Sequence, residues 1–226
     1  MKSKWVPHEL NEAQKQKRFD AATRLFERYS NDELDLEQIV TCDEKWIAFD
    51  NPHRHNEWRS EDQAPSSTPV KDFRKEKRML IVFWDRRGVI HWELLEKGQS
   101  MTAVLYCQIL GRVRQQLRNR RIPVILLHDN SRVHTAKITK KWLEDANWEV
   151  LEHPPYSPDL APSDYHLFRS MEHFLRAKKF RDVAEIEQNL QNFFDSKDRQ
   201  FYRRGILMLP DMWLNVIDSE GDYFDY

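Results

Sequence analysis

The chain has 226 residues, of which 40% are hydrophobic and 32% charged, figures typical of a globular protein with a heavily charged surface. Basic and acidic residues number 36 and 37, and this balance argues against a protein that coats nucleic acid over its whole surface. No apolar run could cross a bilayer and the N-terminus lacks a signal-peptide pattern, so we expect no membrane partner. Cys42 and Cys107 have no spacing typical of zinc sites, and we expect them to be reduced, as in an intracellular protein.

A short irregular segment is expected to come before the first helix. Residues 1–10 contain Pro7 and Trp5, the latter without an obvious local core, and we interpret this stretch as the remnant of an interdomain linker. Asn11 then begins a pattern of apolar residues at helical spacing that continues to about Tyr29. Because the pattern begins so abruptly, we expect the chain to be a fragment whose N-terminal partner domain is missing.

The stretch 38–49 predicts a β-strand that carries an acid at its centre. Ile39, Asp43 and Ile47 share one face of this strand, since side chains alternate between faces with a period of two. A carboxylate within a strand costs stability unless it is paired or binds a cation. Asp43 is therefore a better candidate for a functional site than an acid on the surface.

The next region combines a long polar stretch with a predicted hairpin. Residues 51–77 are polar, contain three prolines and show little periodicity, which indicates a long loop or arm of the kind that is usually functional or disordered. Residues 78–85 and 89–95 then predict two strands. Gly88 lies in the turn between them, where a positive φ is needed.

The most informative stretch is residues 124–130, in which four apolar residues are followed by His128, Asp129 and Asn130. The apolar run predicts a buried strand, and ligand-binding groups of open α/β sheets lie at the carboxyl ends of such strands. Asp129 is therefore a second candidate site residue. A simpler interpretation is that Asp129 caps the following helix, because Asp is a common N-cap.

The order of the predicted elements indicates an α/β fold. A strand that follows each crossover helix pairs in parallel, whereas the hairpin adds antiparallel strands, so we expect a mixed sheet with helices on both faces. The remaining predicted elements are a helix capped by Thr102 and ending near Asn119, a helix over 134–146, a strand over 148–151, an irregular proline-rich stretch over 153–162, a helix capped by Ser163 that begins at Asp164, and three helices within 183–218 broken near Gly205 and Pro210.

Three acids can converge in this arrangement. Asp43 and Asp129 come together if the first and fourth strands are neighbours, and Asp164 can join them from the helix after the proline-rich stretch. Converging carboxylates repel one another unless they share cations, and carboxylate oxygens suit Mg²⁺ or Mn²⁺. Two such ions about 3.5–4 Å apart stabilise the attacking and leaving oxygens of an in-line phosphoryl displacement.

Several motifs together resemble the catalytic domain of mariner transposases, of the Tc/mariner superfamily. In that family 34 residues separate the second and third acids, a spacing that selects Asp164 here rather than Asp159. Two small departures, Cys42 where Gly is more usual and Ser131 where Ala is, leave the three acids intact. The matching stretches are WVPHEL at 5–10, VTCDEKW at 40–46, LHDNSRVH at 127–134, PYSPDLAPSDYHLF at 155–168 and GDYF at 221–224.

The resemblance implies an RNase H-like fold over residues 11–226 and metal-dependent cleavage and strand transfer of DNA. Asp43 would contact both of two Mg²⁺ or Mn²⁺ ions, with Asp129 and Asp164 on one each. The resemblance also implies a nuclear homodimer that pairs two transposon ends, in which a clamp loop over 49–76 grips the linker. Trp5, Pro7 and Trp58 would serve this clamp and linker. The family's helix-turn-helix domains, which precede this region, are absent from the sequence.

Other interpretations of the same residues remain open. Ser131, His134 and Asp129 could suggest a serine hydrolase, but no glycine-flanked nucleophile elbow is present. His128 and His134 could suggest zinc, but no Cys or third His lies at ligand spacing. A scaffold that binds or assembles DNA without catalysis is a further alternative. We expect supporting roles, in hydrogen bonding near the acids or in DNA contact, for His128, Asn130, His134 and His173.

Overall fold

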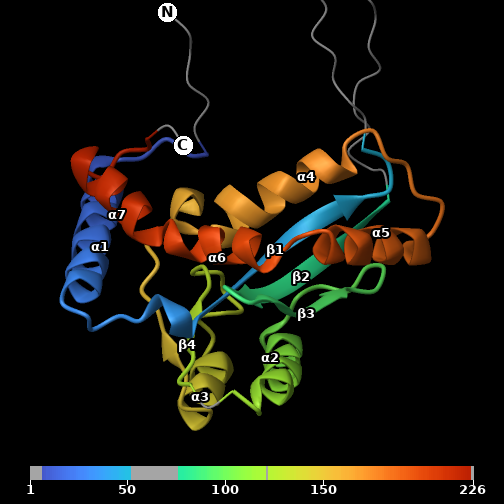
Figure 1. Cartoon of the computed structure of the whole chain (residues 1–226), viewed down its shortest axis with the longest axis horizontal. Coiled ribbons are helices and arrows are strands. Elements are labelled where there is room, and N and C mark those ends of the chain that lie inside the picture. Colours follow the sequence, from blue (N-terminus) through green and yellow to red (C-terminus); the bar gives the residue numbers. More distant parts are fainter. Residues whose placement is uncertain (1–6, 52–75, 121, 225–226) are drawn as a thin grey trace, which may run out of the picture.

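The computed structural model describes residues 7–51, 76–120 and 122–224 (Figure 1). Trp5, Trp58 and nearly all of the predicted clamp loop lie outside these residues. Within the described part, no helix combines the length and apolar character that a bilayer crossing requires.

A five-stranded mixed sheet forms the centre of the fold, in the order β3-β2-β1-β4-β5. β1 pairs antiparallel with β2 and parallel with β4, so the first and fourth strands are neighbours, which is the condition for Asp43 and Asp129 to come together. β5 extends the parallel side of the sheet and β3 the antiparallel side. The strands are β1 (Ile39–Ala48), β2 (Lys77–Asp85), β3 (Gly88–Leu94), β4 (Ile125–Leu127) and β5 (Glu149–Val150).

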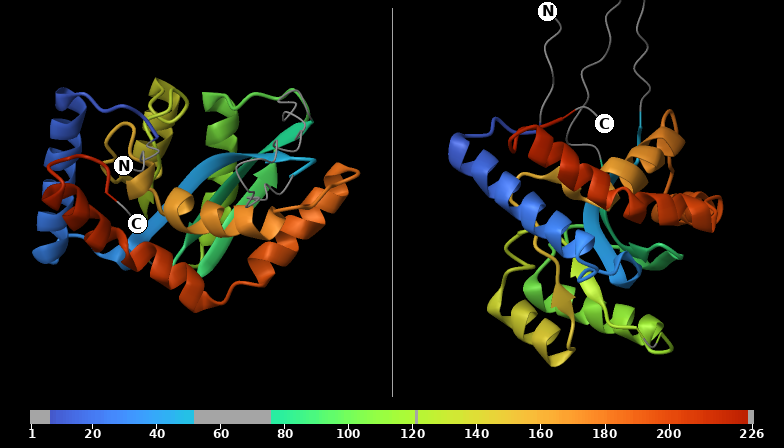
Figure 2. Two further views of the ribbon diagram at one scale, coloured as in Figure 1. Left: turned by 90° about the horizontal axis from the view of Figure 1, so that it is seen from above. Right: turned by 60° about the vertical axis from the view of Figure 1, so that its left-hand side comes forward.

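Helices cover both faces of this sheet, and each face has its own hydrophobic core. Ile39 and Ile47 of β1 pack into the larger core, whereas Val40 and Cys42 of the same strand pack into the smaller core with α2 and α3. This division follows the predicted alternation of β1. Figure 1 shows α2 and α3 below the sheet and α4 to α7 above it, and the views in Figure 2 show α1 beside α7.

Helix ends follow local signals where the capping side chain has no competing partner. The side chain of Thr102 accepts a hydrogen bond from the Leu105 backbone N–H, so the predicted N-cap is confirmed. Asn11, where the first helical pattern is predicted to begin, is the N-cap of α1, and its side chain accepts from the Gln14 N–H. The helices are α1 (Glu12–Ser30), α2 (Ala103–Leu117), α3 (Lys137–Asp145), α4 (Arg169–Leu175), α5 (Val183–Asp195), α6 (Arg199–Leu207), α7 (Leu209–Asp218), the 3₁₀-helices η1 (Leu36–Gln38) and η2 (Pro158–Leu160), and the π-helix η3 (Ser163–Phe168).

Three local predictions are wrong. The helix predicted from His134 begins at Lys137, because His134 lies in the preceding turn with its ring turned toward Asp129. Ser163 does not cap a helix; its Oγ instead accepts a hydrogen bond from Trp84 Nε1 at 3.0 Å. Gly205 does not interrupt a helix but lies within α6.

A buried ion pair joins three distant segments. Arg18 of α1 is 0% exposed and Asp159 of η2 is 1% exposed, and the two guanidinium nitrogens Nη1 and Nη2 donate to the carboxylate at 2.7 and 2.6 Å. Arg18 also donates to Ser157 Oγ at 2.7 Å and to the Gly221 carbonyl at 2.8 Å. The pair therefore ties α1 to the proline-rich turn, which contains Asp159, and to the C-terminal segment.

Gly205 and Gly111 provide a matched test of helix packing. A Cβ at Gly205 would lie 2.7 Å from His166 Cδ2 and 2.8 Å from Trp84 Cη2, whereas a Cβ at Gly111 of α2 would meet nothing within 4 Å. We expect Gly205→Ala to lower the free energy of unfolding by about 1–3 kcal/mol through overpacking. Gly111→Ala should raise it by about 0.5–1 kcal/mol. Urea denaturation measures both, and equal effects would contradict the packing argument.

A second pair of variants tests the buried ion pair. Asp159→Asn leaves the Arg18 guanidinium buried without a counter-charge, and we expect a loss of about 3–5 kcal/mol in the free energy of unfolding. Glu152→Gln is the control, because Glu152 pairs with Arg24 on the surface, where such pairs are worth less than about 1 kcal/mol. Urea denaturation again provides the measurement. A small loss in both variants would show that the buried pair is replaceable.

Candidate active site

The structure brings the three predicted acids to one cavity. Asp43 lies in the middle of β1, Asp129 two residues beyond β4, and Asp164 in the first turn of η3. All three line a cavity of about 510 Å³, together with the end of β4 and the proline-rich turn over 153–158. The carboxyl end of β4, beside β1, therefore forms one wall of this cavity.

Two of the acids form a tightly interacting pair. Burial raises the pKa of Asp43 well above its usual range, and the charges of Asp164 and Glu44 raise it further. Burial also raises the pKa of Asp164, although Lys45 acts in the opposite direction. The two groups therefore share a buried site in which the charge of Asp164 disfavours ionisation of Asp43. A bound cation would relieve this repulsion.

Asp129 differs from the other two acids. Its side chain is 52% exposed, and its Oδ1 accepts hydrogen bonds from the Ser131 backbone N–H at 2.9 Å and from His134 Nδ1 at 2.7 Å. Burial alone would raise the pKa of Asp129, but these hydrogen bonds outweigh burial and lower the pKa to about 2. Asp129 does not cap α3, which begins without a side-chain cap. The simpler interpretation of this residue is therefore wrong.

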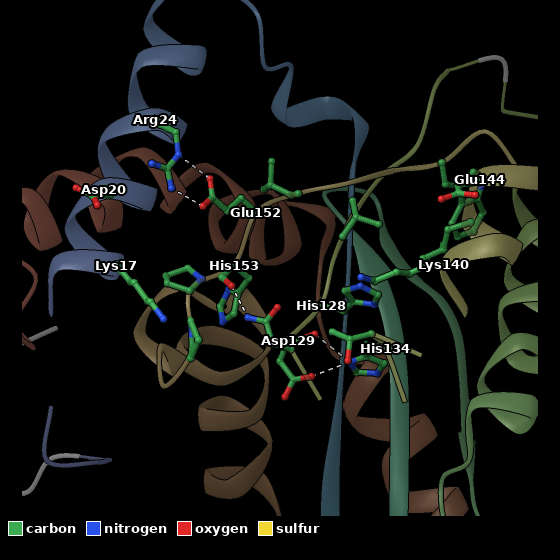
Figure 3. Close-up of a pocket in the computed structure, with 18 residues that line it drawn as sticks. Lys17, Asp20, Arg24, His128, Asp129, His134, Lys140, Glu144, Glu152 and His153 are labelled. Atoms are coloured by element: carbon green, nitrogen blue, oxygen red, sulfur yellow. Dashed lines mark hydrogen bonds and ion pairs between the residues drawn. The ribbon is translucent and has the colours of Figure 1, made fainter. Parts of the chain in front are cut away.

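His134 joins Asp129 to the first strand. Its Nδ1 faces Asp129 (Figure 3). Its Nε2 lies 3.2 Å from Oε1 of Glu44, the residue after Asp43. Burial lowers the pKa of His134, but the hydrogen bonds to the two carboxylates raise it more, to about 9. At neutral pH the ring is therefore cationic and donates from both nitrogens. Sequence reasoning missed Glu44, although its position beside Asp43 was visible.

His128 precedes Asp129 in the chain, lines the same cavity and packs against His134. Its ring stacks on that of His134, with ring centroids 4.5 Å apart and an interplanar angle of 9°, and its Nδ1 lies 2.8 Å from the Tyr106 hydroxyl. Burial and then the charge of His134 lower the pKa of His128 to about 3. The neutral ring of His128 therefore stacks against a cationic ring.

A cysteine completes a cluster that sequence spacing did not reveal. Potential ligand atoms of Cys42, His128 and His134 all lie within 4.8 Å of one another. The Tyr106 hydroxyl, however, contacts both Cys42 Sγ, at 3.2 Å, and His128, and the two nitrogens of His134 face Asp129 and Glu44. The three residues thus belong to a hydrogen-bonded network, in which Tyr106, Asp129 and Glu44 are their partners.

The other predicted site residues lie at the edge of the cavity or away from it. Asn130 donates its amide to the His153 carbonyl and does not orient Asp129. His173 is exposed on α4. Pro7 is also exposed, and its neighbour His8 stacks on Tyr156, which lines the cavity, with ring centroids 4.0 Å apart. His134 points both nitrogens at carboxylates, so it cannot activate Ser131 as a serine hydrolase would require.

A second pocket, of about 640 Å³, adjoins the cavity and shares His128, Asp129 and Asn130 with it. Figure 3 shows Lys17 of α1 and Lys140 of α3 extending into this pocket from opposite walls. Among the described residues, the ion pairs of the neighbouring helix surface include Lys15 with Asp222, but none involves Lys17 or Lys140. Two cations beside a carboxylate cavity are suited to the phosphates of a polyanion.

Comparisons with known proteins agree with this arrangement. A mixed sheet with three acids at the junction of β1 and β4 is an RNase H-like fold of the kind found in transposases that use such acids. The family model for Transposase (partial DDE domain) matches residues 48–125, a segment that contains none of the three acids. The chain is 42% identical to the Mariner Mos1 transposase of Drosophila mauritiana over 98% of its length. It is 41% identical, over the same share, to the human Histone-lysine N-methyltransferase SETMAR.

Solved structures extend the comparison to the whole fold. The crystal structure of the catalytic domain of Mos1 mariner transposase matches with a TM-score of 0.83 and 41% identity, over 98% of this chain and 100% of that one. A Mos1 paired-end complex with the left transposon end matches with a TM-score of 0.93 and 44% identity, over 100% of this chain and 67% of that one. The chain belongs to the mariner transposase family and corresponds to its catalytic domain. It spans 66% of the Mos1 protein and 33% of SETMAR.

The raised pKa of His134 predicts a specific pH dependence of stability. Because the pKa rises from 6.5 to about 9 on folding, the protonated ring stabilises the fold fully below pH 6.5, and this contribution is lost as the pH rises to about 9. The wild-type free energy of unfolding should fall over this range by up to about 3 kcal/mol more than that of His134→Asn. Urea denaturation at several pH values measures the difference. Identical pH dependence in the two proteins would contradict the assignment of charge.

Proposed function

We propose that this chain is the catalytic domain of a mariner-type transposase and performs divalent-metal-dependent DNA cleavage and strand transfer in cut-and-paste transposition. The observation that carries the proposal is the meeting of Asp43, Asp129 and Asp164 on one cavity. Similarity to a Mos1 strand transfer complex, with a TM-score of 0.93 and 44% identity, supports the same conclusion.

The acids fit a hard divalent cation. All three donors are carboxylates, which Mg²⁺ and Mn²⁺ prefer, and the charge of Asp164 raises the pKa of the buried Asp43, a repulsion that a cation would relieve. Mos1 paired-end complexes have been solved with Mn and with Mg. We infer two ions per site, with Asp43 holding both and Asp129 and Asp164 one each. Bound ions would stabilise the attacking and leaving oxygens of a phosphoryl displacement.

Two lysines beside the cavity would bind the DNA substrate. Lys17 and Lys140 are placed to contact phosphates beside the cavity, and such contacts carry little sequence information. We infer that transposon ends and target DNA are the substrates, that a homodimer pairs the ends, and that the protein acts in the nucleus.

The proposal also covers the linker and clamp. We infer that residues 1–10 belong to a linker, with Trp5 and Pro7, and that residues 49–76, with Trp58, form a clamp that reaches the partner subunit within the catalytic domain 11–226. Deleting residues 52–75 should leave the sheet folded but weaken pairing of two DNA ends by a longer protein that contains this domain. Unchanged paired-complex formation in a gel shift would reject the clamp.

A plasmid-nicking assay tests the chemistry. With Mn²⁺ we expect slow nicking of supercoiled plasmid by the 226-residue chain, and Asp43→Asn, Asp129→Asn and Asp164→Asn should each abolish it, because each removes an ion ligand. Nicking should fall steeply with salt, as phosphate contacts release counterions.

The control variant is Asp145→Asn, since Asp145 lies exposed on α3 and pairs only with Lys141. It should nick at the wild-type rate. Nicking that survives Asp164→Asn would show that the third acid is wrongly assigned. A scaffold without catalysis would bind DNA with similar salt dependence but would not nick it with any metal, so the same assay separates the two functions.

A further inference from the structure

Asp129 is held through one of its two carboxylate oxygens. The hydrogen bonds from Ser131 N and His134 Nδ1, at 2.9 and 2.7 Å, both end on Oδ1. A carboxylate oxygen has about two lone-pair sites, so these donors occupy Oδ1. Figure 3 shows the second oxygen of Asp129 pointing away from His134. The arrangement therefore divides the carboxylate into an anchored oxygen and an oxygen that remains for another ligand.

The donor that anchors Asp129 is itself held rigidly. The His134 side chain is 1% exposed, its ring lies 4.5 Å from that of His128 and 4.4 Å from that of Tyr106, and its Nε2 lies 3.2 Å from Glu44 Oε1. Glu44 follows Asp43 on β1. The chain of contacts Glu44–His134–Asp129 thus connects the strand that carries Asp43 to the turn that carries Asp129, across 90 residues of sequence.

We infer that His134 and Glu44 are positioning residues that present Asp129 as a one-oxygen ligand for a divalent cation, an inference that rests on the proposed function. Asp129 lies on a turn and is half exposed, so without the anchor its side chain can rotate away from Asp43 or turn both oxygens to the ion. A small cation such as Mg²⁺ needs near-ideal octahedral geometry, which a freely rotating ligand does not supply. Hydrogen-bonding partners of metal ligands generally act in this way.

The direct test is Mn²⁺ binding to variants of His134, measured by isothermal titration calorimetry without DNA and by the Mn²⁺-dependent rise in melting temperature. His134→Ala removes the donor, and we expect Mn²⁺ to bind about 10–100-fold more weakly. In His134→Asn the amide nitrogen lies near the position of Nδ1, so it restores a donor to Asp129 without reaching Glu44. This variant should recover much of the lost affinity. The half-saturating Mn²⁺ concentration for nicking should follow the same order.

A matched control lies on β3, away from the cavity. There the distance between His91 Nε2 and Glu93 Oε2 is 3.0 Å. His91→Ala should bind Mn²⁺ as the wild type does. Unchanged affinity in His134→Ala, or equal losses in the Ala and Asn variants, would overturn the inference, because the second result is what a purely structural histidine predicts.

Glu44 provides an independent test in case His134→Ala does not fold. Glu44→Ala leaves the histidine in place but removes its support, and we expect weaker Mn²⁺ binding, with Glu93→Ala as the unaffected control. Wild-type affinity in a folded Glu44→Ala would overturn the role of Glu44. If all these variants bind Mn²⁺ with wild-type affinity, this inference fails but the proposed function stands. If the wild-type chain neither binds Mn²⁺ nor nicks DNA, the proposed function and this inference fail together.

Discussion

The buried pair of Arg18 and Asp159 is the constraint on which the rest of the site depends. Removing two charges from water costs several kcal/mol for each ion, and the structure offsets this cost because the guanidinium donates to Asp159, Ser157 and the Gly221 carbonyl together. The contacts hold α1, the proline-rich turn and the C-terminal segment in one arrangement. Asp164 follows this turn directly, so the place of the third carboxylate depends on an ion pair that never touches the cavity.

The three carboxylates of the cavity are not equivalent. Burial raises the pKa values of Asp43 and Asp164, whereas the donors around Oδ1 lower the pKa of Asp129 to about 2. Of the three acids, Asp129 therefore has the strongest tendency to be ionised. A cation that enters the cavity would relieve the repulsion between the buried acids.

Local signals in the sequence failed wherever a distant partner used the same atoms. Ser163 is a residue type that commonly caps helices, but its hydroxyl accepts a hydrogen bond from Trp84, 79 residues earlier. Gly205 is a residue type that disfavours a helix, but its missing Cβ lets α6 approach Trp84 and His166 closely. His134 has a helical pattern after it, but its ring lies between Asp129 and Glu44, and Glu44 is 90 residues earlier. In each case tertiary contacts outweighed a preference worth about 1 kcal/mol.

The sequence by itself determined the alternation of β1, the order of strands and crossovers, the start of the first helix at Asn11, the cap at Thr102 and the three candidate acids, because periodicity, capping and motif spacing are local properties. Only the tertiary structure decided that Glu44 reaches His134 and that Arg18 reaches Asp159, partners 90 and 141 residues apart. The same holds for the meeting of Cys42 with the two histidines. Such contacts depend on which charges and rings are buried together, and burial is settled by the packing of the whole chain.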